Sequence, residues 1–315
     1  MKSLNIIIVN WNSGNQLYDC LKSVKQTKKD SFKLNKVIVI DNNSADNSLD
    51  NLDKINIPLK IIKNKKNKGF AAACNQGAKD SNSDYLLFLN PDTKLFDESL
   101  SKSVSFIEKK ENDNLGILGI QLVNENGVIQ RTSSRFPSFK NLTIEILGLN
   151  KIFKNKFYGH FMKEWGHNNN QVVDQVMGAF FLVKSSLFKK IKGFDERFFV
   201  YYEEVDFSYR AKKKGFKSYY LSDVQAFHKG GGTSEQVKAA RLFYSLRSRI
   251  LYSFKHFSKY KAIIVLFMTL IIEPFTRSVY NLVLERSINN FKETTKGYYN
   301  LYKDLPNIFT EIKKH

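Results

Sequence analysis

The sequence places acidic and amide side chains directly after apolar runs, where they could bind a nucleotide. Asp41 follows the β-branched run Val37–Ile40 and precedes Asn43. A carboxylate at the end of a buried strand can accept hydrogen bonds from ribose hydroxyls or from a nucleobase N–H. The alternative is a helix N-cap, because Asp, Asn and Ser all favour that position.

A second carboxylate, Asp92, follows the apolar run Leu86–Leu89 through Asn90 and Pro91. Hard carboxylate oxygens suit Mg²⁺ or Mn²⁺, and such an ion neutralises a diphosphate and helps it to leave. Asn-Pro-Asp is also good material for a simple turn, which is the alternative.

Two glutamates, Glu203 and Glu204, follow the aromatic run Phe198–Tyr202. A glutamate in an apolar pocket has a raised pKa, which suits a general base. The alternative is that these acids merely occupy the first turn of a helix, where the helix dipole favours them.

His228 precedes a flexible segment, Gly230–Gly232. Neutral imidazole is a good ligand for Mn²⁺ and similar ions, and the glycines would let the loop fold over a diphosphate. A single histidine in a structural role is the alternative.

A further segment, residues 67–77, combines a glycine at a helix start with a basic side chain. Gly69 would permit close approach of the backbone to a phosphate, and Lys68 would supply a counter-charge. A closely packed alanine-rich helix explains the same residues nearly as well.

These side chains need a sheet that brings strand ends together. Apolar strands are expected at residues 4–9, 37–40, 59–62, 85–89 and 176–183, and helices at 17–24, 46–52, 67–78 and 203–214. The alternation of strands and helices predicts an α/β fold with a mainly parallel sheet. Ligands of such a sheet gather at the carboxyl ends of its strands.

Composition narrows the class of protein. The 315 residues carry a net charge of +20, which predicts an anionic partner: nucleic acid, a membrane surface or phosphorylated substrates. No helix-turn-helix, RNP or zinc-finger pattern supports a nucleic-acid-binding protein. With no secretory signal at Met1, Cys20 and Cys74 are expected to be reduced thiols in a cytoplasmic protein.

In their order and on predicted strand ends, these segments resemble the inverting family 2 glycosyltransferases of the GT-A fold. The resemblance covers about residues 4–234 and is strongest over Gly193–Glu196, Phe198–Arg210 and His228. It implies an α/β GT-A fold, with a Rossmann-like, mixed and mainly parallel sheet flanked by helices. It also implies a nucleotide-sugar donor and a divalent metal, Mg²⁺ or Mn²⁺.

The resemblance assigns a role to each segment. The family's Asp-X-Asp motif reads Asn90-Pro91-Asp92, and its Glu-Asp pair reads Glu203-Glu204, which makes Glu204 the expected catalytic base. Asp92 and His228 are the expected metal ligands. The residues expected to bind the nucleotide sugar are Asp41, Asn43, Asn67, Lys68, Gly69, Phe70, Asn75, Asn90 and Asp92. Those expected on the acceptor side are Gly178, Ala179 and Glu203.

The resemblance is closest to bacterial rhamnosyltransferases of O-antigen, capsule or cell-wall biosynthesis. It therefore implies a dTDP- or UDP-sugar donor, with dTDP-rhamnose among the candidates, and a glycan or polyprenyl-diphosphate-linked acceptor. The substitutions at Asn90 and Glu204 leave an alternative, a non-catalytic sugar- or partner-binding relative of the same fold.

The C-terminal region differs from the rest of the chain. Residues 1–234 are expected to form the catalytic domain and residues 235–315 a basic helical extension, with 14 Lys or Arg against 6 Asp or Glu. No stretch of 18 to 20 consecutive apolar residues is found, the longest approach being Ala262–Ile272. The extension is expected to lie on the inner face of the cell membrane. The alternative is a helical lid or a dimer surface, which would make the protein a homo-oligomer.

Overall fold

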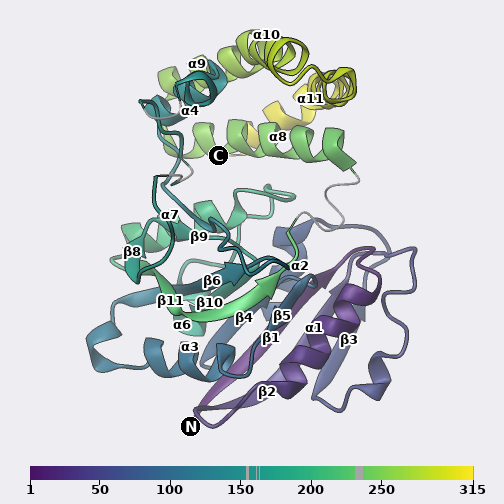
Figure 1. Ribbon diagram of the computed structural model, residues 1–315, viewed down its shortest axis with the longest axis vertical. Helices are drawn as coiled ribbons and strands as arrows, with labels where there is room; N and C mark the ends of the chain where they lie inside the picture. The colour runs from purple at the N-terminus through teal and green to yellow at the C-terminus, as the bar shows by residue number, and fades with distance from the viewer. Residues whose placement is uncertain (154–155, 161, 163, 231–236, 315) are drawn as a thin grey trace. The chain divides into compact units, whose positions relative to one another are not determined.

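The protein is described by a computed structural model that covers residues 1–153, 156–160, 162, 164–230 and 237–314 (Figure 1). It forms two compact units, described separately below. The first comprises Met1–Ser134, Trp165–Glu196 and Glu203–Thr233, and the second Arg135–Glu164, Arg197–Tyr202 and Ser234–His315. Two earlier segments thus group with the C-terminal helices. The predicted boundary at residues 234 and 235 lies outside the described residues and stays a prediction.

The first unit is built on a mixed, mainly parallel sheet in the order β3-β2-β1-β4-β10-β6-β11-β5, with β8 beside β11 and a separate β7-β9 pair. The strands are β1 Lys2–Asn10, β2 Phe32–Asp41, β3 Leu59–Lys63, β4 Tyr85–Leu89, β5 Thr93–Leu95, β6 Leu115–Val123, β7 Ser133–Ser134, β8 Gln171–Val173, β9 Gln175–Val176, β10 Phe180–Lys184 and β11 Lys217–His228. The helices of this unit are α1 Asn15–Gln26, α2 Phe70–Ala78, α3 Ser99–Ile107, α6 Ser185–Lys190 and α7 Glu203–Lys213, with short turns η1 Leu52–Lys54 and η2 Lys110–Asn112.

Both faces of the sheet are covered because its strands are apolar on both sides. Ile6 and Ile8 of β1 pack on one side with the buried residues of α1 and α3. Ile7 and Val9 point to the other side and pack with α2, α6 and α7. Successive side chains of a strand point to opposite faces, so a continuous apolar run requires two helical layers.

The direction of the strands decides where the polar side chains gather. Strands β1, β2 and β4 are parallel, β10 is antiparallel to β4 and β6, and β11 is parallel to β6. The carboxyl ends of β1, β2, β4, β6 and β11 therefore meet at one edge of the sheet. Asp41, Asp92 and His228 all lie at this edge. The predicted mixed, mainly parallel α/β fold is confirmed.

Three predicted elements are wrong in detail. Residues 46–52 form turns, not a helix, because the Asp46 carboxylate accepts hydrogen bonds from the Gly14 and Ser48 backbone N–H groups. The helix predicted from residue 67 begins at Phe70, since Gly69 has a φ of 85°. The strand predicted over 176–183 is divided into β9 and β10 by a turn at residues 178–179.

The second unit is helical. Its elements are α4 Phe139–Ile146, α5 Leu149–Ile152, α8 Lys238–His256, α9 Lys259–Phe267, η4 Met268–Ile272, α10 Glu273–Val279, η5 Tyr280–Leu284 and α11 Ile288–Lys313. The segments α9, η4, α10 and η5 run on as one helix, Lys259–Leu284, with π-helical turns at η4 and η5.

The expectation that no segment is long enough to cross a bilayer is corrected by this helix. Among the residues that the structure describes, Lys259–Leu284 is long and apolar enough by length and composition, with a mean hydropathy of 1.8 over its most apolar window. The sequence argument counted consecutive apolar residues, whereas a helix tolerates polar residues that find partners on a neighbouring helix.

Candidate active site

The two side chains predicted to bind a metal, Asp92 and His228, lie side by side. Strand β11 pairs with β5 so that His228 stands opposite Thr93, the residue after Asp92. His228 Nε2 is 3.4 Å from Asp92 Oδ1, and the two side chains are only 7% and 11% exposed. Residues 136 positions apart in sequence are thus brought to one point.

Gln130 holds the His228 ring through Nδ1 and leaves Nε2 facing Asp92. The Gln130 Nε2 amide donates to the His228 backbone carbonyl at 2.8 Å, so the amide oxygen Oε1 faces His228 Nδ1, also at 2.8 Å. That oxygen can only accept, so Nδ1 carries a proton. In the neutral ring, the lone pair of Nε2 then points at the Asp92 carboxylate. A cation between the two groups would turn this repulsion into attraction.

The pair fits a divalent metal. Two ligands at about 2.1 Å from one ion and at roughly a right angle lie about 3 Å apart, close to the separation found here. Within the described parts of the chain, His, Cys, Asp and Glu form no group of three or more that could hold a metal. A site with two protein ligands is the arrangement expected where substrate phosphates complete the coordination of Mg²⁺.

Asp41 is held rigidly at the end of β2. Its Oδ1 accepts hydrogen bonds from Asn10 Nδ2 at 2.8 Å and from Ser44 Oγ at 2.6 Å. Asn10 also donates to Ser48 Oγ, and both Asn10 and Asp41 are buried. The neighbouring Asn43 is exposed, with a φ of 65°. Asn10 was not predicted from the sequence. It ends β1 as Asp41 ends β2, and the two residues are paired in the sheet register, so its position was a signal that could have found it.

The loop before α2 is shaped by amide side chains. Asn67 Oδ1 accepts a hydrogen bond from the Gly69 N–H, and Asn42 Nδ2 donates to the Gly69 carbonyl. Lys68 between them is exposed. This geometry is compatible with the predicted phosphate or nucleotide contacts. The Lys68 ammonium lies in solvent, and Gly69 beside it has no side chain to block the approach of a ligand to the backbone.

The predicted acceptor-side residues Gly178 and Ala179 lie in the turn before β10, where Gly178 approaches Phe70 at the start of α2. The Ala179 carbonyl accepts hydrogen bonds from Asn90 N at 3.1 Å and from Thr93 Oγ1 at 3.4 Å, which fixes the turn that carries Asp92. A side chain at Gly178 would meet the Phe70 ring at 3.8 Å. Both residues therefore shape the site through the backbone.

Asn75, predicted to contact the nucleotide, has a different role in this geometry. Its Nδ2 donates to the Phe194 carbonyl and to Glu196 Oε1, and its Oδ1 accepts from the Phe194 N–H, each at 2.9 Å. Both N–H donors of the amide are thus used by the loop after α6, and its oxygen accepts one hydrogen bond from the same loop. The structure assigns Asn75 to positioning that loop.

The segment with the strongest family resemblance is largely a structural clamp. Arg210 donates to Asp206 Oδ2 and to the carbonyls of Ile191 and Gly193. Phe194 packs in a cluster of aromatic rings beneath the sheet edge. The clamp ties α7, which begins with Glu203 and Glu204, to the loop after α6.

Helix α7 opens with two acids, the buried Glu203 and the partly buried Glu204. Burial raises the pKa of Glu203 well above its ordinary value, and the charge of Glu204 raises it further. Burial also raises the pKa of Glu204. One oxygen of each carboxyl has no hydrogen-bond partner, and Glu203 is 4% exposed whereas Glu204 is partly exposed. Glu204 is therefore the more accessible member of the pair.

We expect Glu203→Gln to stabilise the protein at high pH. A carboxyl whose pKa is raised in the folded state contributes stability below its unfolded pKa, and this contribution is lost as the pH rises through the folded value. At pH 8 the variant should gain about 1 to 3 kcal/mol, seen as a Tm higher by several degrees, and the gain should vanish near pH 4. Thermal denaturation across this range measures it. Glu111→Gln, at a side chain 75% exposed, is the control, and an equal gain at both pH values would contradict the expectation.

Of the three glycines after His228, the structure describes only Gly230. Gly230 has a φ of 69°, a conformation that favours glycine, and a side chain there would come within 3.2 Å of Gln130. Gly231 and Gly232, predicted to fold over a diphosphate, lie outside the described residues.

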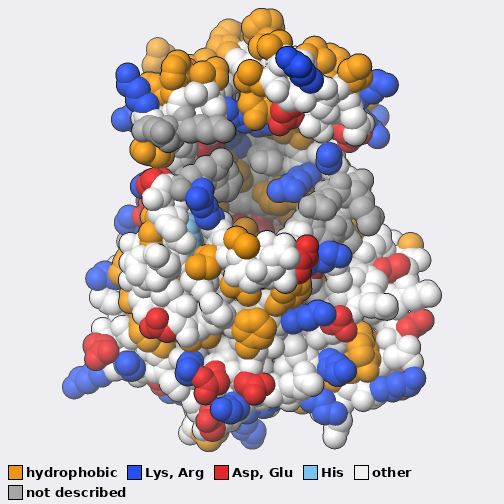
Figure 2. All heavy atoms as spheres, in the orientation of Figure 1, with side chains coloured by type: hydrophobic (Ala, Val, Ile, Leu, Met, Phe, Trp, Pro, Cys, Tyr) orange, Lys and Arg blue, Asp and Glu red, His pale blue; other side chains and the backbone are white. Residues whose placement is uncertain are grey.

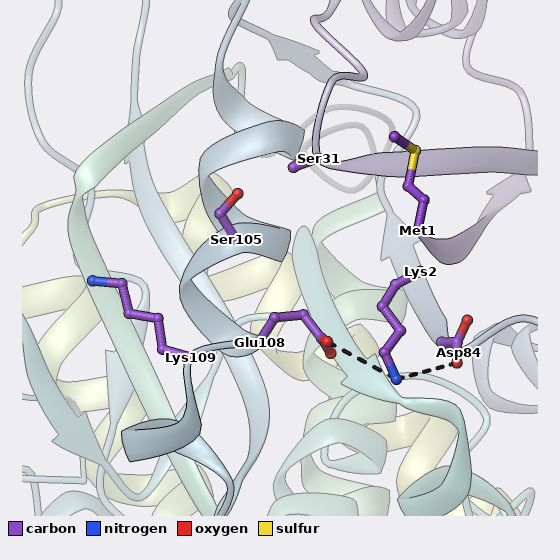
Figure 3. Close-up of a pocket in the computed structure, with 7 residues that line it drawn as sticks. All are labelled: Met1, Lys2, Ser31, Asp84, Ser105, Glu108 and Lys109. Atoms are coloured by element: carbon purple, nitrogen blue, oxygen red, sulfur yellow. Dashed lines mark ion pairs between the residues drawn. The ribbon is translucent and has the colours of Figure 1, made fainter.

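A cavity of about 610 Å³ lies at the other edge of the sheet (Figure 3). It is at the amino ends of β1 and β4, where Lys2 Nζ points between Asp84 Oδ1 at 3.6 Å and Glu108 Oε2 at 3.9 Å. These side chains satisfy one another, and none of the predicted site residues lines the cavity. The cavity is thus separate from the carboxyl edge that carries Asp41, Asp92 and His228.

Known proteins of similar sequence are glycosyltransferases. The low-salt glycan biosynthesis hexosyltransferase Agl10 of Haloferax volcanii is 24% identical over 264 residues, which cover 82% of this chain and 78% of that protein. Rhamnosyltransferase WbbL of Escherichia coli K12 is 28% identical over 148 residues, or 46% of this chain and 52% of WbbL. The chain thus spans about half the length of WbbL in that match.

Two solved structures share the fold. The mannosyltransferase PcManGT of Pyrobaculum calidifontis, in complex with GDP-Man and Mn²⁺, has a TM-score of 0.54 at 11% identity, covering 98% of this chain and 87% of its own. S. aureus TarS 1–349, in complex with UDP-GlcNAc, has a TM-score of 0.53 at 17% identity, covering 99% and 82%. These are GT-A glycosyltransferases, and the predicted GT-A fold is confirmed.

The family model described as Glycosyl transferase family 2 matches residues 5–192, which include most of β1, the Asp41 and Asp92 turns and the turn before β10. Since this match covers more than half of the chain, the protein belongs to glycosyl transferase family 2.

Proposed function

We propose that the protein is an inverting, metal-dependent glycosyltransferase that moves a sugar from a dTDP- or UDP-sugar to a hydroxyl of a glycan or lipid-linked acceptor. The convergence of Asp92 with Nε2 of His228 carries this proposal, because a carboxylate oxygen and an imidazole nitrogen 3.4 Å apart are a suitable pair of ligands for a divalent cation. The Glu203-Glu204 pair, on a helix of the same unit, supports it.

The proposed reaction is a single displacement. The Glu204 carboxylate takes the proton from the acceptor hydroxyl as that oxygen forms a bond to the anomeric carbon of the donor. The bond from this carbon to the diphosphate oxygen breaks on the opposite side, and the nucleoside diphosphate leaves with the electron pair. The configuration at the anomeric carbon is inverted. Glu203, the more deeply buried acid, keeps its proton and lets Glu204 carry the charge.

Asp92 and His228 would hold the divalent metal, which neutralises the charge that develops on the leaving diphosphate. The ordered Asp41 carboxylate would accept hydrogen bonds from the ribose or base. Asn43, Asn67, Lys68, Gly69, Phe70 and Asn90 are proposed to complete the nucleotide-sugar site.

The relatives support the class of donor. PcManGT was crystallised with GDP-Man and Mn²⁺ and TarS with UDP-GlcNAc, so proteins of this fold bind nucleotide sugars. Agl10 and WbbL are named as a hexosyltransferase and a rhamnosyltransferase. An N-acetylglucosaminyl-diphospho-decaprenol L-rhamnosyltransferase of Mycobacterium tuberculosis, 25% identical over 146 residues, supports a rhamnosyl donor and a lipid-linked acceptor. Surface polysaccharides such as O-antigen are the proposed product.

A nucleotide-sugar screen by thermal shift tests the proposal. We expect one donor, dTDP-rhamnose being the first to try, to raise the Tm by several degrees with Mn²⁺ or Mg²⁺ and by much less with EDTA. Release of the nucleoside diphosphate from the bound donor separates an enzyme from a non-catalytic relative. Binding of a donor without release in the presence of acceptor extracts would favour that second candidate, which the Asn90 and Glu204 substitutions suggest.

We also propose that the protein works in the cytoplasm, on the inner face of the cell membrane, where a polyprenyl-diphosphate acceptor would be presented. The excess of Lys and Arg in residues 235–315 supports this placement, since anionic lipids attract such segments. A homo-oligomer formed through the same helices is the alternative.

A further inference from the structure

The long helix of the second unit exposes a row of large apolar side chains. Six of them are spaced four residues apart: Ile263, Phe267, Ile271, Phe275, Val279 and Val283, each between 42% and 71% exposed. Figure 2 shows hydrophobic side chains gathered over α9 and α10. The row follows a helix of 26 residues, about 39 Å long.

The two π-helical turns keep this row on one face. In a regular α-helix, residues four apart drift around the axis because a turn takes 3.6 residues. The turns η4 and η5 contain more residues per turn and rotate the following segment back. Because of the π turns, apolar side chains spaced four residues apart stay on one face of the helix and form a continuous stripe. No charged side chain interrupts it.

The opposite face of the helix is fixed to the second unit by polar contacts. Glu273 is 1% exposed and accepts hydrogen bonds from Arg249 of α8 and from Arg277. Thr276 Oγ1 donates to the Ile146 carbonyl of α4, and Asn281 Nδ2 donates to Thr294 Oγ1 of α11. A helix anchored along one side to α4, α8 and α11 cannot cross a bilayer without carrying their charges with it.

From this arrangement we infer that Lys259–Leu284 lies flat in the interface of an anionic lipid leaflet, with the Ile263–Val283 stripe inserted among the acyl chains. A row of exposed aromatic and aliphatic side chains along one face of a helix, with basic side chains at its ends, is the pattern of helices that lie in the interface of anionic membranes. The exposed Lys259 and Lys261 at one end and Arg286 at the other are placed to reach lipid phosphates.

The inference deepens the proposed membrane placement and rests on it. The proposed membrane placement rested on basic side chains, whereas this inference names the surface that inserts. The apolar stripe holds the protein in the membrane, and the basic side chains only favour anionic lipids. Binding should therefore weaken with salt without disappearing, because apolar insertion is not screened.

Co-sedimentation of the full chain with vesicles tests the stripe. We expect binding to phosphatidylcholine vesicles with about a third phosphatidylglycerol, weaker at 0.5 M NaCl but still measurable. The double variant Ile271→Gln/Phe275→Gln, at positions 60% and 71% exposed, should bind at least about tenfold more weakly. Both substitutions leave the charge unchanged, so the loss reports apolar insertion.

The control exchanges two exposed apolar residues of the first unit, Ile61→Gln/Val172→Gln, and should bind vesicles like the wild type. Unchanged binding of the stripe variant would overturn the inference. So would a wild-type dimer in solution that the stripe variant converts to monomers, since the stripe would then face a second copy. Retention in vesicles after an alkaline carbonate wash would instead indicate a spanning helix and overturn the flat orientation.

Donor binding separates this inference from the proposed function. The stripe variant should retain the Mn²⁺-dependent thermal shift with the nucleotide sugar, because the stripe lies outside the unit that carries Asp92 and His228. Vesicle binding without any donor shift would leave the stripe supported and the proposed function contradicted. A thermal shift with the donor but no vesicle binding would support the proposed function and contradict the inference about the stripe.

Discussion

Replacing Glu204 with Gln is expected to lower turnover by about 10²- to 10⁴-fold while donor affinity stays within about twofold of the wild type. The variant keeps the size and most contacts of the side chain but cannot accept the acceptor's proton. The donor-side residues Asp41 and Asp92 are unchanged. Turnover is measured as release of nucleoside diphosphate in the presence of acceptor, and donor affinity by calorimetry or thermal shift.

The pH profile gives an independent measure of the same base. Because burial raises the pKa of Glu204, the carboxylate forms only as the pH rises through that higher value. The wild-type kcat/KM should therefore rise with pH over a range above that of an ordinary glutamate, and this rise should be missing in Glu204→Gln. Glu111→Gln is the matched control and should behave like the wild type. Wild-type turnover in Glu204→Gln would remove the residue from the mechanism.

Replacing Asp92 with Ala is expected to abolish the metal-dependent part of donor binding. In the presence of Mn²⁺ the donor Kd should rise by at least about 100-fold, since even the groups that only orient a metal ligand are worth about 10- to 100-fold. His228→Ala should have an effect of the same kind. Gln130→Leu, which leaves both ligands but frees the imidazole, should weaken metal-dependent binding by about tenfold.

Chelation supplies the control for Asp92→Ala. With EDTA, the wild type and the variant should bind the donor with equal, weak affinity, because the lost side chain acts through the ion. A variant that keeps metal-dependent binding would show that the ion is held elsewhere. A deficit that persists in EDTA would show that Asp92 contacts the donor directly, without the metal.

The sequence predicted the sheet well because its strands are apolar on both faces. The runs at residues 4–9, 37–40 and 85–89 have no helical periodicity, and each ends in a polar side chain that cannot continue the apolar run. The turns that begin at Asp46 were missed because its carboxylate accepts a hydrogen bond from the distant Gly14 N–H as well as from the nearby Ser48 N–H. A local pattern cannot report a contact across 32 positions.

The sequence by itself determined which chemistry the chain could carry: the carboxylates at Asp41, Asp92 and Glu204, the imidazole at His228, and the apolar strands that end beside them. Only the tertiary structure decided which of these meet. The strand order brings Asp92 to His228, and Gln130 orients the His228 imidazole so that its Nε2 faces Asp92.

The same holds for the second unit. The sequence of Lys259–Leu284 shows an apolar segment, but its exposed stripe exists only because α4, α8 and α11 bind the opposite face and two π turns realign the spacing. Residue types follow from the sequence alone. Proximity and exposure depend on contacts between segments far apart in the chain, and no local pattern encodes them.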